Sequence, residues 1–356
     1  FALFLSLPVL AVAQIKVSVP PARPLRQLPD TATVLVVGDV MMHRDQISNS
    51  ARADGTYDFS TYLANIKPLI ENADLSVANM EFTLAGKPYT GYSCFSAPDG
   101  YEDYVAACGV DVFLTANNHI LDKGDAGLNR TLLLCEGSIH TGTGRDSLEY
   151  FSTNPLIISC KGARIALLNF TYGTNLSSRS QWPKVSRMDR REVSRQFDEA
   201  RRRGADFIIV LPHWGTEYRL RHDSSQEEWA HWLVQQGADA IVGAHPHVVQ
   251  DTSHIAGVPV IYSMGNAVSN MSAPNTQLEL AVKIDLVYNR LSGEARVEEP
   301  RLHFLWCSRP GGKTGNYTTI LIDKYLEHKE LWNNPADWGN MLSTLERVRK
   351  TTGIGQ

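Results

Sequence analysis

The sequence is poor in cysteine and has no closely spaced cysteine pair. Five cysteines stand among 356 residues, without a CxxC motif or regular spacing. This pattern excludes a zinc ribbon and a disulfide-stapled scaffold. Because the count is odd, at least one thiol stays unpaired whatever disulfides form. Cys135 and Cys160 lie in apolar runs and are predicted to be buried as small hydrophobic residues.

The sequence also lacks an excess of charge of one sign. Its 34 Lys and Arg residues nearly balance 38 Asp and Glu residues, for a net charge of -4. No large single-sign field is therefore available to attract nucleic acid or an anionic membrane surface. After the N-terminal segment no apolar stretch of about 20 residues occurs, so no transmembrane anchor is expected. No internal repeat of fixed period is present.

The N-terminal residues have the pattern of a secretory signal. Residues 1–13 form an apolar run that ends in Ala11-Val12-Ala13, which is typical of a signal-peptide core followed by a cleavage site. A first core strand or helix is the alternative. Residues 14–32 contain four prolines and are expected to be an extended lead-in. Export to the periplasm or the cell exterior is the corresponding prediction.

Beyond residue 33, β-branched runs alternate with amphipathic stretches. Strands are predicted at residues 33–37, 74–78, 111–115, 164–170, 207–211 and 240–242, and helices at 59–70, 126–135, 190–203 and 226–236. Two further apolar segments, 258–263 and 278–286, follow with little helix between them. The pattern predicts an α/β fold, a four-layer α-β-β-α sandwich of two mixed sheets flanked by helices, over residues 33–310. Residues 311–356 are predicted to be a C-terminal helical extension.

Polar residues suited to metal binding follow the ends of five predicted strands. They are Asp39, Glu81, the Asn117-Asn118-His119 segment, His213, and the His245-Pro246-His247 segment. Each alone is equally typical of a turn or a helix cap. Together they predict one site, because open α/β sheets place their sites at the carboxyl ends of strands. Imidazoles combined with carboxylates favour Mn, Fe or Zn as one or two divalent ions.

Several motifs together resemble a known family, the CapA or poly-γ-glutamate biosynthesis (capsule synthesis) family, a relative of the calcineurin-like metallophosphoesterases. The motifs span about residues 33–270 and are VVGDVMMHR (36–44), ANME (78–81), FSAP (95–98), LTANNHILDKG (114–124), PHWGTEY (212–218), GADAIVGAHPHVVQ (237–250) and YSMGN (262–266). The resemblance implies a β-sandwich with a two-metal site.

The resemblance also assigns roles to individual residues. Glu81 stands where phosphoesterases have a bridging aspartate, and His119 matches the residue that protonates the leaving group. Asp122, three residues later, is predicted to orient the His119 imidazole. The implied metal ligands are Asp39, Glu81, Asn118, His213, His245 and His247, with Asn79 and Asn266 as additional candidates.

The first metal-binding motif departs from the family pattern. Met41 stands where the phosphoesterases have a histidine, and a thioether is a poor ligand for these ions. His43 is an alternative ligand, or else a solvent-facing or supporting group. Arg44 either holds a substrate anion or pairs with the carboxylate cluster. Trp214 and Tyr218 are predicted to pack the His213 loop.

Three functional interpretations remain open. The first is a metal-dependent hydrolase of phosphoester, acyl or γ-glutamyl bonds linked to capsule or poly-γ-glutamate metabolism. The second is a non-catalytic component of capsule assembly and export that binds an anionic envelope polymer. The third is a structural sandwich with vestigial ligands. Expected partners are therefore an anionic polymer or its fragments, and capsule-assembly proteins.

Overall fold

Two β-sheets face one another in the computed structural model, which describes residues 30–355. The predicted signal segment 1–13 and most of the proline-rich lead-in 14–32 lie outside the described residues. In the larger sheet the order is β16-β15-β13-β1-β2-β3-β4, with β14 paired to β13. Its strands are β1 (Asp30–Val40), β2 (Leu75–Met80), β3 (Val112–Leu114), β4 (Ile139–Thr141), β13 (Leu278–Asn289), β14 (Glu294–Val297), β15 (Arg301–Ser308) and β16 (Thr318–Leu321).

The smaller sheet has the order β11-β12-β10-β9-β7-β6. Its strands are β6 (Leu156–Cys160), β7 (Ala163–Thr171), β9 (Phe207–His213), β10 (Ala240–Val242), β11 (Thr252–Ile255) and β12 (Val258–Ile261), and a separate short pair joins β5 (Thr143–Gly144) to β8 (Lys184–Val185). Both large sheets are mixed. The strands β1, β2 and β3 run parallel, as do β7, β9 and β10, while β13 and β11 add antiparallel pairs.

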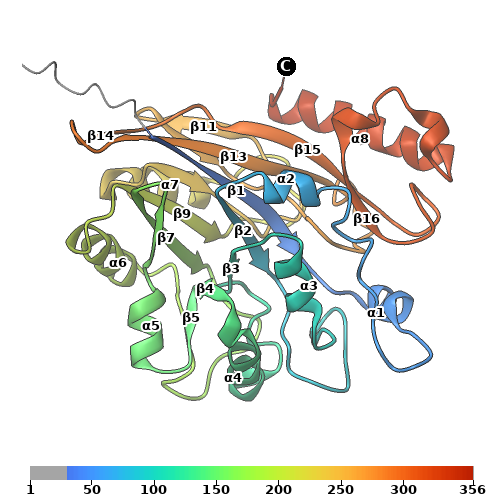
Figure 1. Ribbon diagram of the computed structural model, residues 1–356, viewed down its shortest axis with the longest axis horizontal. Coiled ribbons are helices and arrows are strands. Elements are labelled where there is room, and N and C mark those ends of the chain that lie inside the picture. Colours follow the sequence, from blue (N-terminus) through green and yellow to red (C-terminus); the bar gives the residue numbers. More distant parts are fainter. Residues whose placement is uncertain (1–29, 356) are drawn as a thin grey trace, which may run out of the picture.

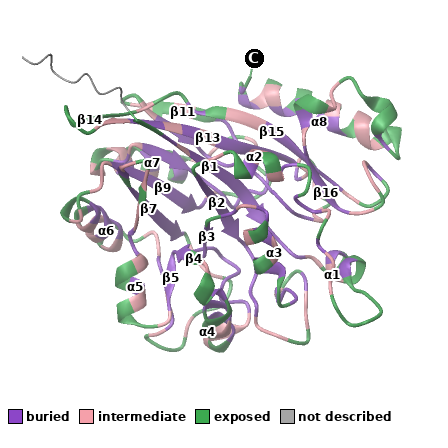
Figure 2. Cartoon of the chain, viewed as in Figure 1, coloured by how far each residue is buried: buried purple, intermediate pink, exposed green. Residues whose placement is uncertain are grey.

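The alternation of side chains along β1 explains the layering. Val34 and Val36 join the apolar cluster between the sheets, where they meet residues of β7 and β9. Leu35 and Val37 point to the opposite face and join a second cluster, which α2 (Lys67–Glu71) and α3 (Tyr101–Ala107) cover. Helices α6 (Arg190–Arg202) and α7 (Ser224–Gln236) cover the outer face of the smaller sheet. The predicted four-layer α-β-β-α sandwich is confirmed (Figures 1 and 2).

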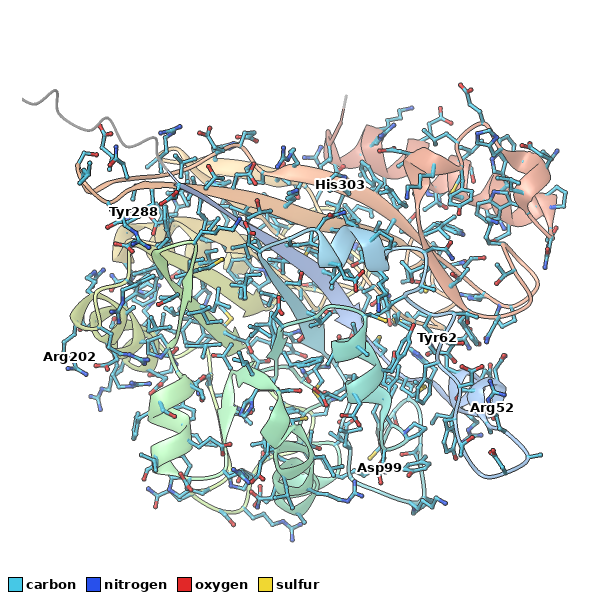
Figure 3. The ribbon with its side chains drawn as sticks, in the orientation of Figure 1. Arg52, Tyr62, Asp99, Arg202, Tyr288 and His303 are labelled. Carbon is cyan, nitrogen blue, oxygen red and sulfur yellow. The ribbon has the colours of Figure 1, made fainter. Side chains whose placement is uncertain are left out.

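The remaining helices occupy the edges of this sandwich. They are α1 (Arg44–Ser50), α4 (Gly124–Leu134), α5 (Ser147–Thr153) and α8 (Pro335–Thr352). Charged side chains such as Arg202 and Asp99 lie at the periphery, whereas Tyr62 is buried and donates its hydroxyl to the carbonyl of Gln46 in α1 (Figure 3).

The helix predicted over residues 59–70 is wrong over most of its length. The structure has turns up to residue 66, and α2 begins only at Lys67. Pro68 has no N–H to donate to a preceding carbonyl, so a helix can begin there but cannot run through it. The apolar side chains that suggested the helix, such as Phe59, Tyr62 and Ile66, are buried all the same. The periodic pattern therefore predicted correctly which side chains are buried, but it predicted the wrong backbone conformation.

The segment after residue 310 contributes to the core. Strand β16 forms the edge of the larger sheet, beyond the predicted domain end, and α8 buries Met341 and Val348 in the cluster that also contains Trp306. The sequence anticipated only a helical extension here. Neither α8 nor any other helix within residues 30–355 combines the length and apolarity needed to cross a membrane.

All five cysteines are free thiols. Cys135 is buried, as predicted, but the same prediction for Cys160 is wrong, because that thiol is partly exposed. Cys160 ends β6, and β6 is an edge strand of the smaller sheet, so one side of it has no neighbouring strand to cover it.

Candidate metal centre

The carboxyl ends of parallel strands from both sheets meet at one buried place. Asp39 lies near the end of β1, Glu81 follows β2, and His213 ends β9. His245 and His247 lie in the loop after β10. All five side chains are buried. The structure thus brings together residues that are more than two hundred positions apart in the sequence, as the strand-end pattern predicted.

Local backbone geometry forces this convergence. The loop after β10 carries φ angles of 100° at His245 and 58° at His247, in the left-handed region that residues with a Cβ seldom adopt. Gly38 allows β1 to approach the loop at Gly265, since a Cβ at Gly38 would lie 2.0 Å from the Gly265 carbonyl oxygen. The N–H of Asp39 donates to that same carbonyl at 3.0 Å. A tight backbone contact therefore fixes the first carboxylate.

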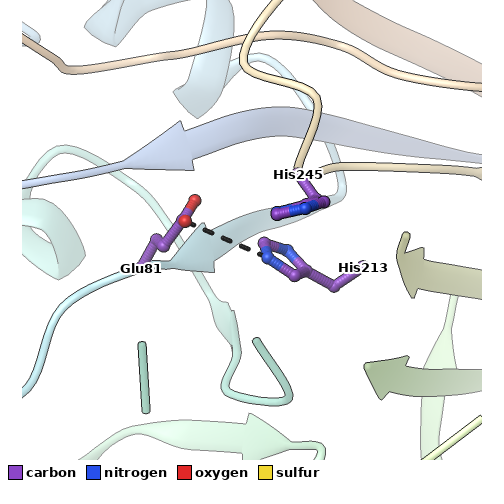
Figure 4. Close-up of side chains that lie close together, drawn as sticks. All are labelled: Glu81, His213 and His245. Carbon is purple, nitrogen blue, oxygen red and sulfur yellow. Dashed lines mark ion pairs between the residues drawn. The ribbon is translucent and has the colours of Figure 1, made fainter. Parts of the chain in front are cut away.

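Two fully buried groups of acidic and imidazole side chains have metal-binding geometry. One consists of Asp39, Glu81 and His247, and the other of Glu81, His213 and His245; within each group the ligand atoms lie within 4.8 Å of one another. Figure 4 shows the second group, with His213 facing the Glu81 carboxylate. The Oδ1 atom of Asn118 lies 2.9 Å from Nε2 of His213, beside this second group. Glu81 is common to both groups, as a bridging carboxylate would be.

The Glu81 carboxylate tests whether this pocket suits a cation. Both of its oxygens are buried and neither has a hydrogen-bond partner. The Nε2 atoms of His119, His213 and His247 lie 3.9, 3.9 and 3.8 Å from Oε1, too far for a hydrogen bond. An unpaired buried carboxylate costs several kcal/mol, roughly, unless a cation compensates it. The donor set therefore fits one or two divalent ions.

Hydrogen bonds in and around the two groups orient the ligands. Nδ1 of His247 lies 2.9 Å from Oδ1 of Asn266 and 3.2 Å from Oδ2 of Asp39, which leaves Nε2 directed toward Glu81. Asn79 donates to Oδ1 of Asp39 at 2.6 Å. Such partners fix the tautomer and the orientation of a ligand. Asn79 and Asn266, predicted as additional ligands, thus have a visible positioning role.

The electrostatics of the site follow from burial. Burial, and next the charge of Asp39, raise the pKa of Glu81 well above its ordinary value. Burial and neighbouring imidazoles lower the pKa of His213 and of His245 well below 6.5. Burial also lowers the pKa of His247, but the hydrogen bond and charge of Asp39 outweigh it, so the net shift is upward. His213 and His245 are therefore neutral near pH 7, the form in which imidazole binds metal.

His119 and Asp122 form a buried pair beside the metal-binding groups. Nδ1 of His119 lies 2.7 Å from Oδ2 of Asp122, so the turn does bring the two side chains together. The backbone N–H of Phe95 also donates to Oδ2, at 2.8 Å, and holds the carboxylate in place. With Nδ1 bound in this way, Nε2 faces the interior of the site.

The loop after β1 departs from the predicted contacts. Met41 is buried in the apolar cluster outside the larger sheet, where it packs among hydrophobic side chains. His43 caps α1, and its Nδ1 lies 3.2 Å from both Oε1 of Gln46 and the backbone nitrogen of Asn270. Arg44 is exposed and forms no salt bridge within residues 30–355, so its predicted pairing with the carboxylates is wrong. A substrate contact by Arg44 stays a prediction.

Sequence reasoning missed Glu217. This residue is exposed, yet its carboxylate forms a third group with the ligand atoms of His245 and His247, again within 4.8 Å. It lies four positions after His213 in the PHWGTEY motif, but no strand end marks it. Glu217 is marked only by the approach of its loop to the loop after β10, and this approach is evident in the folded structure but not in the sequence.

Exposed aromatic rings surround the centre. The ring centroid of Tyr172 lies 4.6 Å from that of His245, Tyr218 lies 6.3 Å from His247, and Tyr92 lies 6.3 Å from His119. The prediction that Trp214 packs its loop is confirmed, because the buried indole donates to the carbonyl of Tyr262. Tyr218 is 43% exposed. A cavity of about 310 Å³ opens beside Tyr172, lined also by Met188, Trp214, Asp223, Gln226 and Trp229.

Known proteins are similar to this chain. Residues 33–271 match the family described as bacterial capsule synthesis protein PGA_cap. The capsule biosynthesis protein CapA of Bacillus anthracis is 28% identical over 71% of this chain and 64% of its own length. The PGA biosynthesis protein CapA of Bacillus subtilis is 26% identical over 73% of this chain and 69% of its own. Among solved structures, the calcineurin-like phosphoesterase YfkN of Bacillus subtilis is 14% identical, with a TM-score of 0.49 over 90% of this chain and 99% of that one.

The family match covers the larger part of the chain and includes every strand end that carries a candidate ligand. The alignment leaves about a third of the Bacillus anthracis relative unmatched, since it spans 64% of that protein. The chain belongs to the bacterial capsule synthesis protein family, PGA_cap.

Proposed function

We propose that this protein is a metal-dependent hydrolase that acts on a phosphoester or γ-glutamyl bond in capsule or poly-γ-glutamate metabolism. The observation that carries the proposal is the Glu81 carboxylate, buried without a partner and faced by three imidazole Nε2 atoms at 3.8 to 3.9 Å. A structural sandwich gains nothing from such an arrangement, because it stabilises the fold only when a cation is present.

The chain offers two sets of ligands around Glu81. Asp39 and His247 would hold one ion with it, and Asn118, His213 and His245 would hold the other. Divalent ions in such a pair supply Lewis acidity and an activated water at neutral pH. Manganese, iron and zinc suit the mixture of nitrogen and oxygen ligands.

The residues around the ligands supply proton transfer and substrate contact. His119 directs Nε2 into the site and donates a proton to the leaving oxygen or nitrogen atom. Asp122 accepts the hydrogen bond from Nδ1 and stabilises the imidazolium, as the acidic member of a catalytic triad does. The rings of Tyr92, Tyr172 and Tyr218 border the centre and contact the bound substrate.

A binding role without turnover is the second candidate, and Met41 is the observation that favours it. Its side chain occupies the apolar cluster, so the loop after β1 supplies one ligand fewer than in the phosphoesterase pattern. In that case the centre would bind an anionic polymer during capsule assembly and would not cleave it.

One experiment separates these functions. Purified protein is analysed for Mn, Fe and Zn and assayed with aryl phosphates, phosphodiesters and γ-glutamyl peptides. The variants are His245→Ala and, as a matched control, His254→Ala, whose imidazole is exposed and pairs with Glu299. The hydrolase proposal expects bound metal, turnover in the wild type and the control, and no turnover in His245→Ala. Metal without turnover on any substrate would favour the binding role.

Export is part of the proposal and rests on the signal-like residues 1–13. Expression of the full-length gene product, followed by cell fractionation and N-terminal sequencing, tests it. A mature chain that begins near Gln14 in the periplasm or medium is expected. Retention of residues 1–13 in a cytoplasmic product would contradict export.

A further inference from the structure

The two metal-binding groups do not offer equal numbers of ligands. Glu81, His213 and His245 have the Asn118 carbonyl oxygen beside them, which makes four candidate ligands. Asp39, Glu81 and His247 make only three, and the Met41 thioether is buried elsewhere. Protein sites for these ions commonly have four or more ligands. The group of Asp39, Glu81 and His247 therefore offers one protein ligand fewer than the group of His213 and His245.

The loop that carries Glu217 is tied directly to the loop that carries the last two histidines. The N–H of Trp214 donates to the carbonyl of Ala244 at 3.1 Å, and the N–H of Tyr218 donates to that of Pro246 at 2.9 Å. These two bonds clamp residues 214–218 across the His-Pro-His segment. Tyr218 has a φ of 64°, so the chain turns sharply just after Glu217.

This clamp places the exposed Glu217 carboxylate beside one histidine of each group. Its oxygen lies within 4.8 Å of the ligand nitrogens of His245 and His247, which belong to different groups. Within residues 30–355, Glu217 forms no salt bridge with lysine, arginine or histidine. A carboxylate held near two imidazoles without a cationic partner is suited to a metal ion.

His43 is the competing residue, because it follows Met41 in the sequence. Its Nδ1 is engaged with Gln46 and Asn270 at the start of α1, and its ring packs edge-on against Phe95. His43 belongs to none of the three groups with metal-binding geometry in residues 30–355. The geometry thus favours the carboxylate that comes from the opposite loop.

We propose that Glu217 is a further ligand of the metal position formed by Asp39, Glu81 and His247. There it takes the place of the imidazole for which this sequence has Met41. The inference rests on the proposed metal centre and specifies how its second ion is held. Because Glu217 is exposed, its carboxylate is less rigidly positioned than the buried ligands. The position made of Glu81, Asn118, His213 and His245 therefore fills first, and the position closed by Glu217 fills second and exchanges faster.

Manganese titration of the whole chain tests the assignment without an activity assay. Metal-free wild type, Glu217→Gln, His43→Ala and the control Glu346→Gln, an exposed residue of α8, are titrated with Mn²⁺ by calorimetry, and their metal content is measured after gel filtration. Electron paramagnetic resonance then distinguishes a coupled pair of ions from an isolated one. Circular dichroism confirms that each variant folds.

The expected result is two Mn²⁺ ions and a coupled signal in the wild type, His43→Ala and Glu346→Gln. Glu217→Gln should keep one tight ion with an isolated six-line signal, and its second site should weaken by at least about tenfold, the smallest loss typical of altering a ligand environment. Two ions of unchanged affinity in Glu217→Gln would overturn the inference, as would loss of the second ion in His43→Ala. A wild type that binds no metal would instead refute the proposed function itself.

Discussion

Oδ2 of Asp122 accepts hydrogen bonds from two donors at once, His119 Nδ1 at 2.7 Å and the backbone N–H of Phe95 at 2.8 Å. The second bond anchors the carboxylate to the main chain, so the carboxylate can anchor the imidazole. Both side chains are buried, which strengthens the electrostatic part of the contact. The pair therefore has the geometry of a positioned general acid and its orienting group.

Removal of this acid should lower turnover and leave the metal in place. His119→Ala is expected to reduce kcat by about 10² to 10⁴-fold, the usual contribution of general acid catalysis. Asp122→Asn should reduce kcat by less, because the amide keeps an acceptor for Phe95 but loses the charge that stabilises the imidazolium. Metal content measured on the same samples should equal that of the wild type. Loss of metal in His119→Ala would show that this imidazole is a ligand instead.

Metal removal should destabilise the fold through Glu81. An ion at a hundred times its Kd stabilises the native state by about 2.7 kcal/mol. The midpoint temperature of thermal unfolding should therefore rise when Mn²⁺ is added to wild-type protein from which a chelator has removed the metal. Glu81→Gln should lose this shift, because both groups share that carboxylate. Glu346→Gln serves as the exposed control and should keep the full shift.

The buried carboxyl group of Glu279 should make the stability of the fold depend on pH. Burial raises the pKa of this carboxyl group well above its ordinary value of 4.5. Oε1 accepts the N–H of Gly38 at 2.8 Å, and Oε2 is buried without a partner. Above pH 4.5 the unfolded chain releases the proton that the folded chain keeps, so this contribution to stability is present below 4.5 and is lost as the pH rises.

Glu279→Gln should remove this loss of stability at higher pH, because the amide keeps the acceptor for the N–H of Gly38 and carries no charge. As the pH rises above 4.5, the free energy of unfolding of the variant is expected to increase relative to that of the wild type, by up to about 1.4 kcal/mol per pH unit. Thermal or urea unfolding of the metal-free proteins across this range measures the difference. A difference that does not change with pH would mean that Glu279 ionises normally in the fold.

The sequence predicted the centre well because strand ends are locally encoded. The runs that lead to Asp39, Glu81 and His213 are mainly apolar strands, and parallel strands bring such ends to one edge. The alternation of predicted strands with predicted helices likewise gave the layers. These features depend on short stretches of chain, and so the residues alone specify them.

The features that sequence reasoning missed depend on contacts between distant segments. Glu217 approaches the histidines only because Trp214 and Tyr218 hydrogen-bond to the loop after β10. Residues 59–66 have helical spacing but form turns around the buried ring of Tyr62. Cys160 lies at a sheet edge, which no local pattern shows. In each case tertiary packing decided the outcome.

Tyr172 should contribute to substrate binding and not to metal binding. Its ring lies against His245, is 52% exposed, and borders the cavity of about 310 Å³, so one face is open to a bound molecule. An aromatic contact contributes about 0.5 to 1.5 kcal/mol beyond the area it buries, which corresponds to a rise in KM of up to roughly tenfold in Tyr172→Ala. Tyr172→Phe keeps the ring and should keep the KM.

Steady-state kinetics and metal analysis of the same preparations decide this point. Phe151→Ala is the matched control, because Phe151 is also an exposed ring, 47% accessible, but packs against Arg195 on α6. The KM of the control should equal that of the wild type. If Tyr172→Ala lost metal, its ring would instead be holding His245 in place, because the tilted ring contact between the two side chains also restrains the imidazole.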